Sequence, residues 1–467
     1  MTRRVALVAA FLLAAPIACG KSRQSGAPPM RAAGAAPEAP SGSAAQGSLE
    51  PNSDEVKLEA AESWRQELGR TSPRQIAALP GGGYAVALSF SATVAIEAPD
   101  SSLKHSSAGE DDILVVGVSE AGAVQWVTRI GGAGDEEVKD LIASKNGIHL
   151  AVRTDEPLTV AGRTVAPRAP RSGDALDYPH ITALVRLSGA GQPLAVEALP
   201  NEPREVVMGA LESGDLIMAA SFTGKDELFG HAEVRRVSPH GEVHWTQHIP
   251  AIEVHKVFAW QERLVLSVRA NARLGLWTLD PATGGVIHKY EIEKPLGTGD
   301  LGTIAGAVSD SKGELVGFGE TGDDVMVDGH RIARPSYAIQ PFALRAGGNQ
   351  AVQFIEGPVL TARVVGVGLV RTRPAAVLDV IHTGVDPHLH RGVYVGLLGA
   401  AGVELVPVFQ QRFRNDDWEH APAETVLGNP LSAYAAVIAG DSAAVLGRCE
   451  PNAKTTCLTR IELRPAR

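Results

Sequence analysis

This sequence of 467 residues lacks several features that would name a function. Lysine and arginine are dispersed, no basic block occurs outside the first residues, and the formal net charge is −10, which excludes a nucleic-acid footprint. There is no nucleophile elbow, no zinc-protease helix and no phosphate-binding loop, so no enzyme class is indicated and no cofactor is predicted. The longest apolar run, residues 5–17, is too short for a comfortable membrane span.

The composition favours short strands over helices. Aromatic residues make up only 5% of the chain, while hydrophobic residues at 44% are sufficient for a packed interior. Glycine (50) and proline (30) are abundant, as expected of many strands joined by turns. The length exceeds that of a typical single core, which predicts several domains or a repeat array.

The first twenty residues indicate export. Arg3 and Arg4 precede the apolar run, and small residues follow it, as in a secretory signal. Residues 17–20 (IACG) resemble the bacterial lipoprotein signal, in which the cysteine, here Cys19, becomes the lipidated first residue. Pro16 stands where that motif prefers leucine, and the alternative is an ordinary cleaved signal with an incidental cysteine. No aspartate follows Cys19, so the resemblance implies the outer membrane, with the lipid bilayer as a partner through the acylated N-terminus.

Two N-terminal segments precede the strand-rich part of the chain. Residues 20–52 consist mainly of glycine, alanine, proline and serine, which predicts a disordered tether. Residues 54–69 favour a short helix that packs Trp64 onto the domain, or else a continuation of the tether. The expected division is a signal peptide at 1–19, a tether at 20–71 and a folded domain at 72–467.

A recurrent pattern predicts the architecture of that domain. An apolar run, a glycine turn and a second apolar run place Gly122 four residues before Trp126 and Gly241 four residues before Trp245. Weaker copies recur every ~45–70 residues, the period of a blade-like repeat. They are centred on Gly191, Gly284, Gly348 and Gly402.

With the strand pairs that precede these copies, the unit is about four strands repeated some seven times, which predicts an all-β, seven-bladed β-propeller. Residues 72–79 are expected to close the ring by pairing with the last blade. Tandem β-sandwiches are the rival architecture, but the Cys…Trp…Cys spacing of immunoglobulin domains is missing.

The two tryptophans allow two interpretations. Trp126 and Trp245 could stack on sugars or peptides, but a tryptophan after such a turn more often fills the space between adjacent blades. We interpret Gly122, Trp126, Gly241 and Trp245 as structural residues of the repeat.

The two remaining cysteines suggest a cross-link. Cys449 and Cys457 flank a turn-forming stretch with Pro451 and Asn452, and an oxidising periplasm would permit a disulfide between them. A zinc site is the alternative, but two cysteines without nearby histidine make a poor ligand set.

One histidine-rich loop could bind a metal. Around His382, Asp386, His388 and His390, histidines at i and i+2 of an extended segment point to the same side, and Asp386 could complete a metal site with them. A polar loop that turns at Asp386 and Pro387 accounts for the same residues.

Two modules carry family resemblances. Residues 112–138 are similar to the bacterial β-propeller repeat of the SBBP type through Asp112, Gly122, Trp126, Gly131–Gly132 and Gly134–Asp135. Residues 276–290 resemble the quinoprotein-type propeller repeat through Asp280, Thr283–Gly284 and Tyr290. The resemblance implies a fold and a secreted lipoprotein setting, and no activity.

These observations predict a membrane-anchored bacterial lipoprotein of the cell envelope. Its non-catalytic propeller would be a binding or scaffolding module for an envelope protein or a glycan, at the periplasmic side or the cell surface. The alternative is a secreted hydrolase or lyase whose active site lies in the axial funnel, where residues from several blades leave no local motif. Convergent charged groups in that funnel would favour the enzyme.

Overall fold

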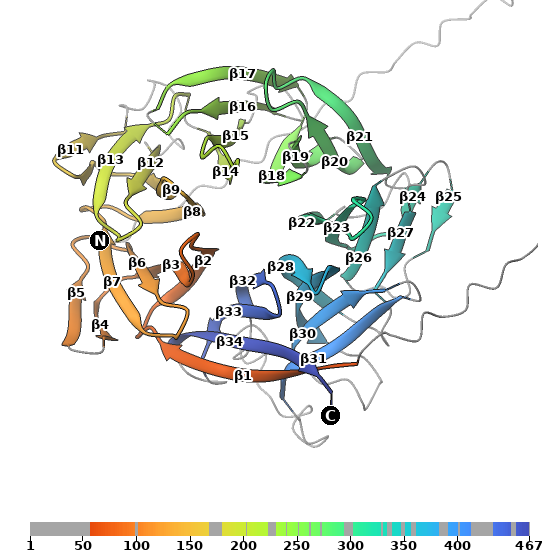
Figure 1. Ribbon diagram of the computed structural model, residues 1–467. Helices are drawn as coiled ribbons and strands as arrows, with labels where there is room; N and C mark the ends of the chain where they lie inside the picture. The colour runs from red at the N-terminus through yellow and green to blue at the C-terminus, as the bar shows by residue number, and fades with distance from the viewer. Residues whose placement is uncertain are drawn as a thin grey trace, which may run out of the picture. The chain divides into compact units, whose positions relative to one another are not determined.

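The computed structural model shows a β-propeller built from antiparallel sheets. It describes residues 57–98, 101–167, 180–201, 203–222, 230–239, 241–250, 252–260, 263–270, 273–293, 302–327, 330–333, 339–346, 351–355, 361–382, 391–399, 402–411, 433–449 and 454–466. Seven sheets contain a run of four strands each, and Figure 1 shows them arranged as seven blades around a centre. The predicted all-β, seven-bladed architecture is confirmed. Cys19 and the predicted tether at 20–52 lie outside the described residues.

Each blade consists of four antiparallel strands, which follow one another from the innermost strand outward. Blade 1 contains β2 (Ser72–Ala78), β3 (Tyr84–Phe90), β6 (Asp112–Val118) and β7 (Val124–Ile130). Blade 2 contains β8 (Glu136–Ser144), β9 (Gly147–Thr154), β12 (Ile181–Leu187) and β13 (Pro193–Ala198). Blade 3 contains β14 (Glu205–Ala210), β15 (Leu216–Phe222), β16 (His231–Val237) and β17 (Val243–Pro250).

The later blades follow the same order. Blade 4 contains β18 (Glu253–Trp260), β19 (Arg263–Ala270), β20 (Arg273–Leu279) and β21 (Val286–Glu293). Blade 5 contains β22 (Thr303–Ser309), β23 (Leu315–Thr321), β26 (Gln340–Ala346) and β27 (Ala351–Phe354). Blade 6 contains β28 (Thr361–Val370), β29 (Arg373–His382), β30 (Arg391–Leu398) and β31 (Val403–Gln411).

Blade 7 joins the two ends of the described chain. Its strands are β32 (Ala433–Ala439), β33 (Ser442–Arg448), β34 (Thr456–Pro465) and, outermost, β1 (Leu58–Glu67). The pairing of β1 with β34 runs from Leu58 opposite Pro465 to Glu67 opposite Cys457. The ring is therefore closed by a strand from the N-terminal side that completes the last sheet.

Two expectations about this segment are wrong. Residues 58–67 form a strand and not a helix, because the unpaired edge of β34 offers them a ladder of backbone hydrogen bonds, shifted in register only at Ser63, that outweighs their helix propensity. The ring is closed by β1, while residues 72–78, expected to close it, form the innermost strand of blade 1. The propeller thus begins at Leu58 instead of residue 72.

Three β-hairpins are inserted between the second and third strands of blades 1, 2 and 5. They are β4–β5 (Thr93–Ala98, Ser101–Ser106), β10–β11 (Leu158–Val160, Arg163–Val165) and β24–β25 (Val325–Val327, His330–Ile332). The first strand of each buries two alternate side chains. The pairs are Val94 and Ile96, Leu158 and Val160, and Val325 and Val327. Each pair packs into a cluster that joins its own blade to the preceding one, so the hairpins seal three of the junctions.

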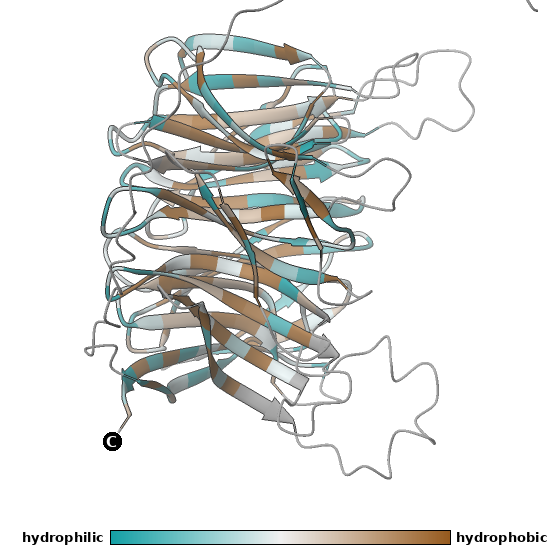
Figure 2. Cartoon of the chain, turned by 90° about the vertical axis from the view of Figure 1, so that its right-hand side faces the viewer, coloured by the Kyte–Doolittle hydropathy of each residue, from teal (hydrophilic) through white to brown (hydrophobic). Residues whose placement is uncertain are grey.

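The core lies between the blades. The second strands are nearly continuous apolar runs; all seven residues of β3 are buried, for example. Side chains from both faces of a blade enter the clusters shared with its neighbours. Figure 2 shows the corresponding brown bands crossing the strands, with teal residues at the turns. Among the described residues, none belongs to a helix of sufficient length and apolarity to cross a membrane.

Candidate functional site: the turn face at blades 1 and 2

The tight turns of the blades lie at one end of the strands. In blade 1 these are the turn from β2 to β3 and the turn from β6 to β7, and the equivalent turns of the other blades lie at the same end. We call this end the turn face. Gly122, at the second turn of blade 1, has φ of +88°, a conformation that glycine adopts without a steric penalty. The recurring glycine of the sequence is explained by this backbone geometry.

The recurring tryptophan lies between blades. Trp126 on the outer strand of blade 1 packs against Gly191 of the blade 2 turn, and Trp245 of blade 3 packs against Gly284 of the blade 4 turn. The indole nitrogen of Trp245 also donates to the Pro281 carbonyl oxygen (2.8 Å). Each ring thus covers a glycine of the next blade, and a side chain at that glycine would occupy the space of the ring. Both rings are half-buried, and the faces that pack on these glycines are covered.

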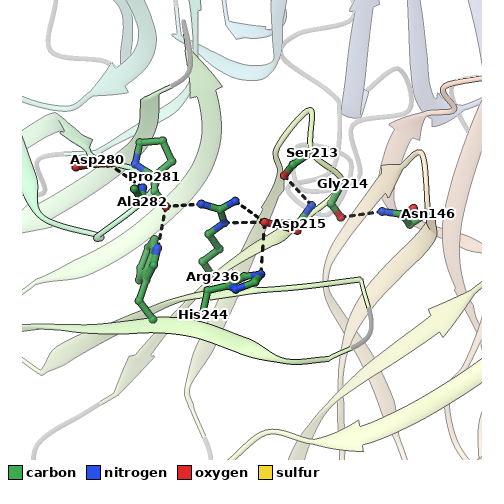
Figure 3. A network of polar contacts seen from close by, with 10 residues as sticks. Asn146, Ser213, Gly214, Asp215, Arg236, His244, Asp280, Pro281 and Ala282 are labelled. Atoms are coloured by element: carbon green, nitrogen blue, oxygen red, sulfur yellow. Dashed lines mark hydrogen bonds and ion pairs between the residues drawn. The ribbon is translucent and has the colours of Figure 1, made fainter.

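Arginines reinforce two of the blade junctions, one of them shared with Trp245. In Figure 3 the Arg236 side chain lies between Asp215 and Pro281; its Nε donates to Asp215 Oδ2 (2.7 Å) and another guanidinium nitrogen donates to the Pro281 carbonyl (2.8 Å). Arg186 of blade 2 donates in the same way to the Pro239 carbonyl of blade 3 (3.0 Å). His244 Nε2 lies 3.7 Å from Asp215 Oδ2, at the edge of ion-pair range.

Four turns surround a cavity between blades 1 and 2. Its volume is about 670 Å³, and it is lined by residues 79–82, 119–121, 144–148 and 188–189, together with Gln125 and Leu194. The lining mixes hydroxyl and amide groups with aliphatic side chains, and among these residues none is aromatic. Glu120 is paired with Arg460 (3.2 Å), so the lining carries little uncompensated negative charge.

A serine–histidine contact borders this cavity. Ser144 Oγ lies 3.5 Å from His149 Nε2, and Ser144 lines the cavity. Burial, with a contribution from Arg186, lowers the pKa of His149 to about 4. A general base must accept a proton from its serine, and this environment opposes the imidazolium that would form. Ser144 Oγ instead accepts a hydrogen bond from the Asn146 backbone N–H (3.2 Å), so the pair stabilises the turn.

Several charged groups on the innermost strands of blades 2, 3 and 4 are paired with one another. Lys139 contacts Glu137 (2.9 Å) and Glu205 of the next blade (3.6 Å). Asp140 is buried, accepts a hydrogen bond from the Met208 N–H (2.7 Å) and lies 3.4 Å from Lys256 Nζ of blade 4. These charges link blades 2, 3 and 4 and do not converge on a reacting centre.

The other predicted sites have different outcomes. Cys449 and Cys457 form a disulfide with Cα atoms 4.9 Å apart, which confirms the predicted cross-link. Asp386, His388 and His390 lie outside the described residues, so the metal prediction stays a prediction. Within the ranges that the structure describes, no group of three or more histidine, cysteine or acidic side chains has metal-binding geometry.

Comparison with known proteins supplies no family. No family model matches the chain, and no curated protein matches its sequence. The WD40 domain of Neurospora crassa Pan2 is similar in structure at 9% identity and a TM-score of 0.48, over 86% of this chain and 95% of that one. The Dos1 propeller is similar at 9% identity and a TM-score of 0.42, over 87% of this chain and 95% of that one. An acylaminoacyl peptidase of Pyrococcus horikoshii is similar at 8% identity and a TM-score of 0.40, over 81% of this chain and 49% of that one. Likeness at this level carries no functional argument, and the fold assignment rests on the sheet topology.

Proposed function

We propose that this chain is a membrane-anchored lipoprotein of the bacterial cell envelope whose propeller binds a polypeptide partner at the turn face, without catalysis. The observation that carries the proposal is the cavity of about 670 Å³ between blades 1 and 2. A fixed framework surrounds it, because its four turns end strands of two packed sheets. Binding surfaces on rigid scaffolds are commonly built from such loops.

The lining favours a peptide segment over a glycan. Leu79, Pro80 and Leu194 supply apolar surface, and Leu194 is 54% exposed. Hydroxyl and amide side chains lie beside them, a mixture that suits a chain with backbone polar groups and aliphatic side chains. Sugars are usually held against aromatic faces, and the described lining residues offer none.

The envelope location rests on the N-terminal sequence and on the repeat resemblance. Residues 17–20 resemble a lipoprotein signal, and residues 112–138 resemble the SBBP-type repeat of secreted bacterial proteins. The Cys449–Cys457 disulfide supports an oxidising compartment such as the periplasm. Acylation at Cys19 would anchor the chain to the outer membrane.

Site-directed photo-crosslinking in intact cells tests the binding proposal. A photo-reactive residue at Gln125, in the cavity, should give a discrete adduct with one envelope protein. The same probe at Lys104, exposed on β5 at the other end of the blade, is the matched control and should give none. Leu194→Glu should abolish the Gln125 adduct while the thermal midpoint stays within a few degrees of the wild type. Equal labelling at both probes, or no adduct at Gln125, would overturn the proposal.

Membrane fractionation tests the anchor separately. The full chain should sediment with outer membranes and carry a lipid label, and Cys19→Ala should release it to the soluble fraction. If the Cys19→Ala protein still fractionates with membranes, the lipoprotein assignment is wrong, whatever the crosslinking shows. Turnover of ester or peptide substrates that Ser144→Ala abolishes would instead establish the hydrolase.

A further inference from the structure

Two buried carboxyl groups meet at the opposite end of the same blade junction. Asp112 is the first residue of β6 in blade 1, and Glu136 is the first residue of β8 in blade 2. Their exposed fractions are 0% and 1%. A buried pair of acidic groups is costly when both are ionised, so the contacts of each oxygen decide how the pair is stabilised.

Asp112 is the member that has a cationic partner. Its Oδ2 accepts hydrogen bonds from Arg129 Nε (2.5 Å) and from the Ala108 backbone N–H (3.1 Å). Its Oδ1 is buried and receives no hydrogen bond from an N–H or hydroxyl donor of the described residues. Asp112 therefore has an arginine at one carboxyl oxygen and no donor at the other, and the second oxygen is available to accept from a proton-bearing neighbour.

Glu136 is that neighbour. Its Oε2 accepts from the Gly132 N–H (3.0 Å) and its Oε1 accepts from the Thr154 hydroxyl (3.0 Å). The Glu136 backbone N–H donates to the carbonyl oxygen of Asp111 (2.8 Å), so Glu136 and Asp112 lie side by side at the starts of their strands. Adjacent buried carboxylates repel each other, and among the described residues no cation pairs with Glu136, so Glu136 is the member of the pair that keeps a proton more readily.

The surrounding elements add negative charge. The only cation in contact with the pair, among the described residues, is Arg129 of β7, and His105 of β5 has its pKa lowered by burial and by that arginine. The pKa of Asp135 is raised by burial and then by neighbouring carboxylates. Those neighbours are Asp111, Asp155, Glu110 and Glu137. Arg153 of β9 lies opposite Glu137 in the strand ladder.

We propose that Asp112 and Glu136 form a proton-dependent latch between blades 1 and 2. With the proton present, Glu136 donates to Asp112 Oδ1 and ties the start of β8 to the start of β6. When the proton leaves, two adjacent buried carboxylates repel and the junction opens more often. The latch does not depend on the proposed binding cavity, which lies at the other end of this junction.

The direction of the pH effect follows from the titration of Glu136. Burial, and to a lesser extent Asp112, raise its pKa from 4.5 to about 7, while in an opened junction the ordinary value returns. Below about pH 4.5 Glu136 is protonated in both the closed and the opened junction, so the equilibrium constant for opening does not change with pH. Between about pH 5 and 7 Glu136 is ionised in the opened junction but still protonated in the closed one, and the opening constant rises about tenfold per pH unit. Above pH 7 Glu136 is ionised in both states and the opening constant levels off.

Hydrogen exchange of the full chain, followed by mass spectrometry, tests the latch. After correction for intrinsic exchange, the opening constant of the β8 amides should rise up to about a hundredfold between pH 5 and 7. Glu136→Gln mimics the protonated acid, since its amide can donate to Asp112, and should remove that rise. Glu156→Gln, an exposed residue of the same region, is the control and should behave as the wild type.

A second measurement does not depend on that variant. Carbon-13 NMR of selectively labelled glutamate should show one carboxyl group titrating near pH 7, and Asp112→Asn should move this midpoint toward 4.5. A Glu136 midpoint at or below 5 in the wild type, or an unchanged pH dependence of exchange in Glu136→Gln, would overturn the latch.

Discussion

Trp64 Nε1 donates a hydrogen bond of 2.9 Å to the backbone carbonyl of Glu120. Trp64 belongs to β1, the outer strand of blade 7, and Glu120 to a turn of blade 1. The Trp64 ring also packs against Gly122, as Trp126 and Trp245 pack against the glycines of their next blades. The tryptophan-on-glycine contact seen between other consecutive blades is thus present where blade 7 meets blade 1. At this closing seam Arg460 of β34 also donates to the Glu120 carbonyl oxygen (2.9 Å).

Truncating Trp64 should weaken the seam. Trp64→Ala removes a half-buried ring and its hydrogen bond, and we expect a loss of about 2 kcal/mol in the free energy of unfolding. Trp64→Phe retains most of the apolar contact and should lose about 1 kcal/mol. Denaturant unfolding, together with hydrogen exchange of the β1 backbone amides as a local measure, distinguishes the two variants. Equal stability of Trp64→Ala and wild type would show that β1 closes the ring through its backbone ladder alone.

The glycine covered by Trp126 offers a test with an internal control. Gly191 and Gly162 both have φ of +75°, but a Cβ at Gly191 would overlap the Trp126 ring, while nothing lies within 4 Å of a Cβ at Gly162. Gly162→Ala should cost only the backbone strain, about 1 kcal/mol. Gly191→Ala adds the overlap and should cost about 2–4 kcal/mol in total. Similar losses for the two variants would mean that the ring moves aside freely.

The disulfide should stabilise blade 7 to a modest extent. Cys449 and Cys457 are separated by 8 positions, and chain entropy assigns a loop of that size about 2–3 kcal/mol. The double variant Cys449→Ser with Cys457→Ser should lower the unfolding free energy by that amount. A reducing agent should produce the same shift in the wild type and none in the variant. A reducing agent that destabilises both proteins equally would point to another cause.

The repeat is predictable from sequence because its determinants are local. A glycine at positive φ and a tryptophan four residues later lie on one hairpin, so Gly122 with Trp126 and Gly241 with Trp245 predict both the turn and the packing. Trp64 carries no such signal, because its strand partner β34 lies at the other end of the chain. Taken alone, its segment has the composition of a helix.

The inserted hairpins carry only a weak local signal. Val94 with Ile96, Leu158 with Val160, and Val325 with Val327 are alternating apolar pairs that follow the second strand of a blade. Their burial depends on the preceding blade, which the sequence does not place. The cavity has no sequence signal at all, since turns distant in the chain form it only after two blades pack.

Acid should destabilise the protein through His149. Burial, with a smaller effect of Arg186, lowers the pKa of His149 from 6.5 to about 4 in the folded chain. The unfolded chain therefore takes up a proton as the pH falls below 6.5, while the folded chain does so only near 4. Stability is fully present above pH 6.5 and declines between 6.5 and 4, by roughly 2 kcal/mol at pH 5.

The matched variants for this prediction are His149→Gln and His288→Gln, because His288 is exposed on β21. Chemical denaturation at pH 7 and pH 5 should show a smaller pH difference for His149→Gln than for the wild type, by about 2 kcal/mol. His288→Gln should reproduce the wild-type difference. Glu136, whose pKa is raised in the folded chain, makes the protein less stable as the pH rises over the same range. The unfolding free energies of the variants must therefore be compared with one another at each pH. A wild-type pH difference that persists in His149→Gln would mean that this imidazole titrates normally in the folded chain.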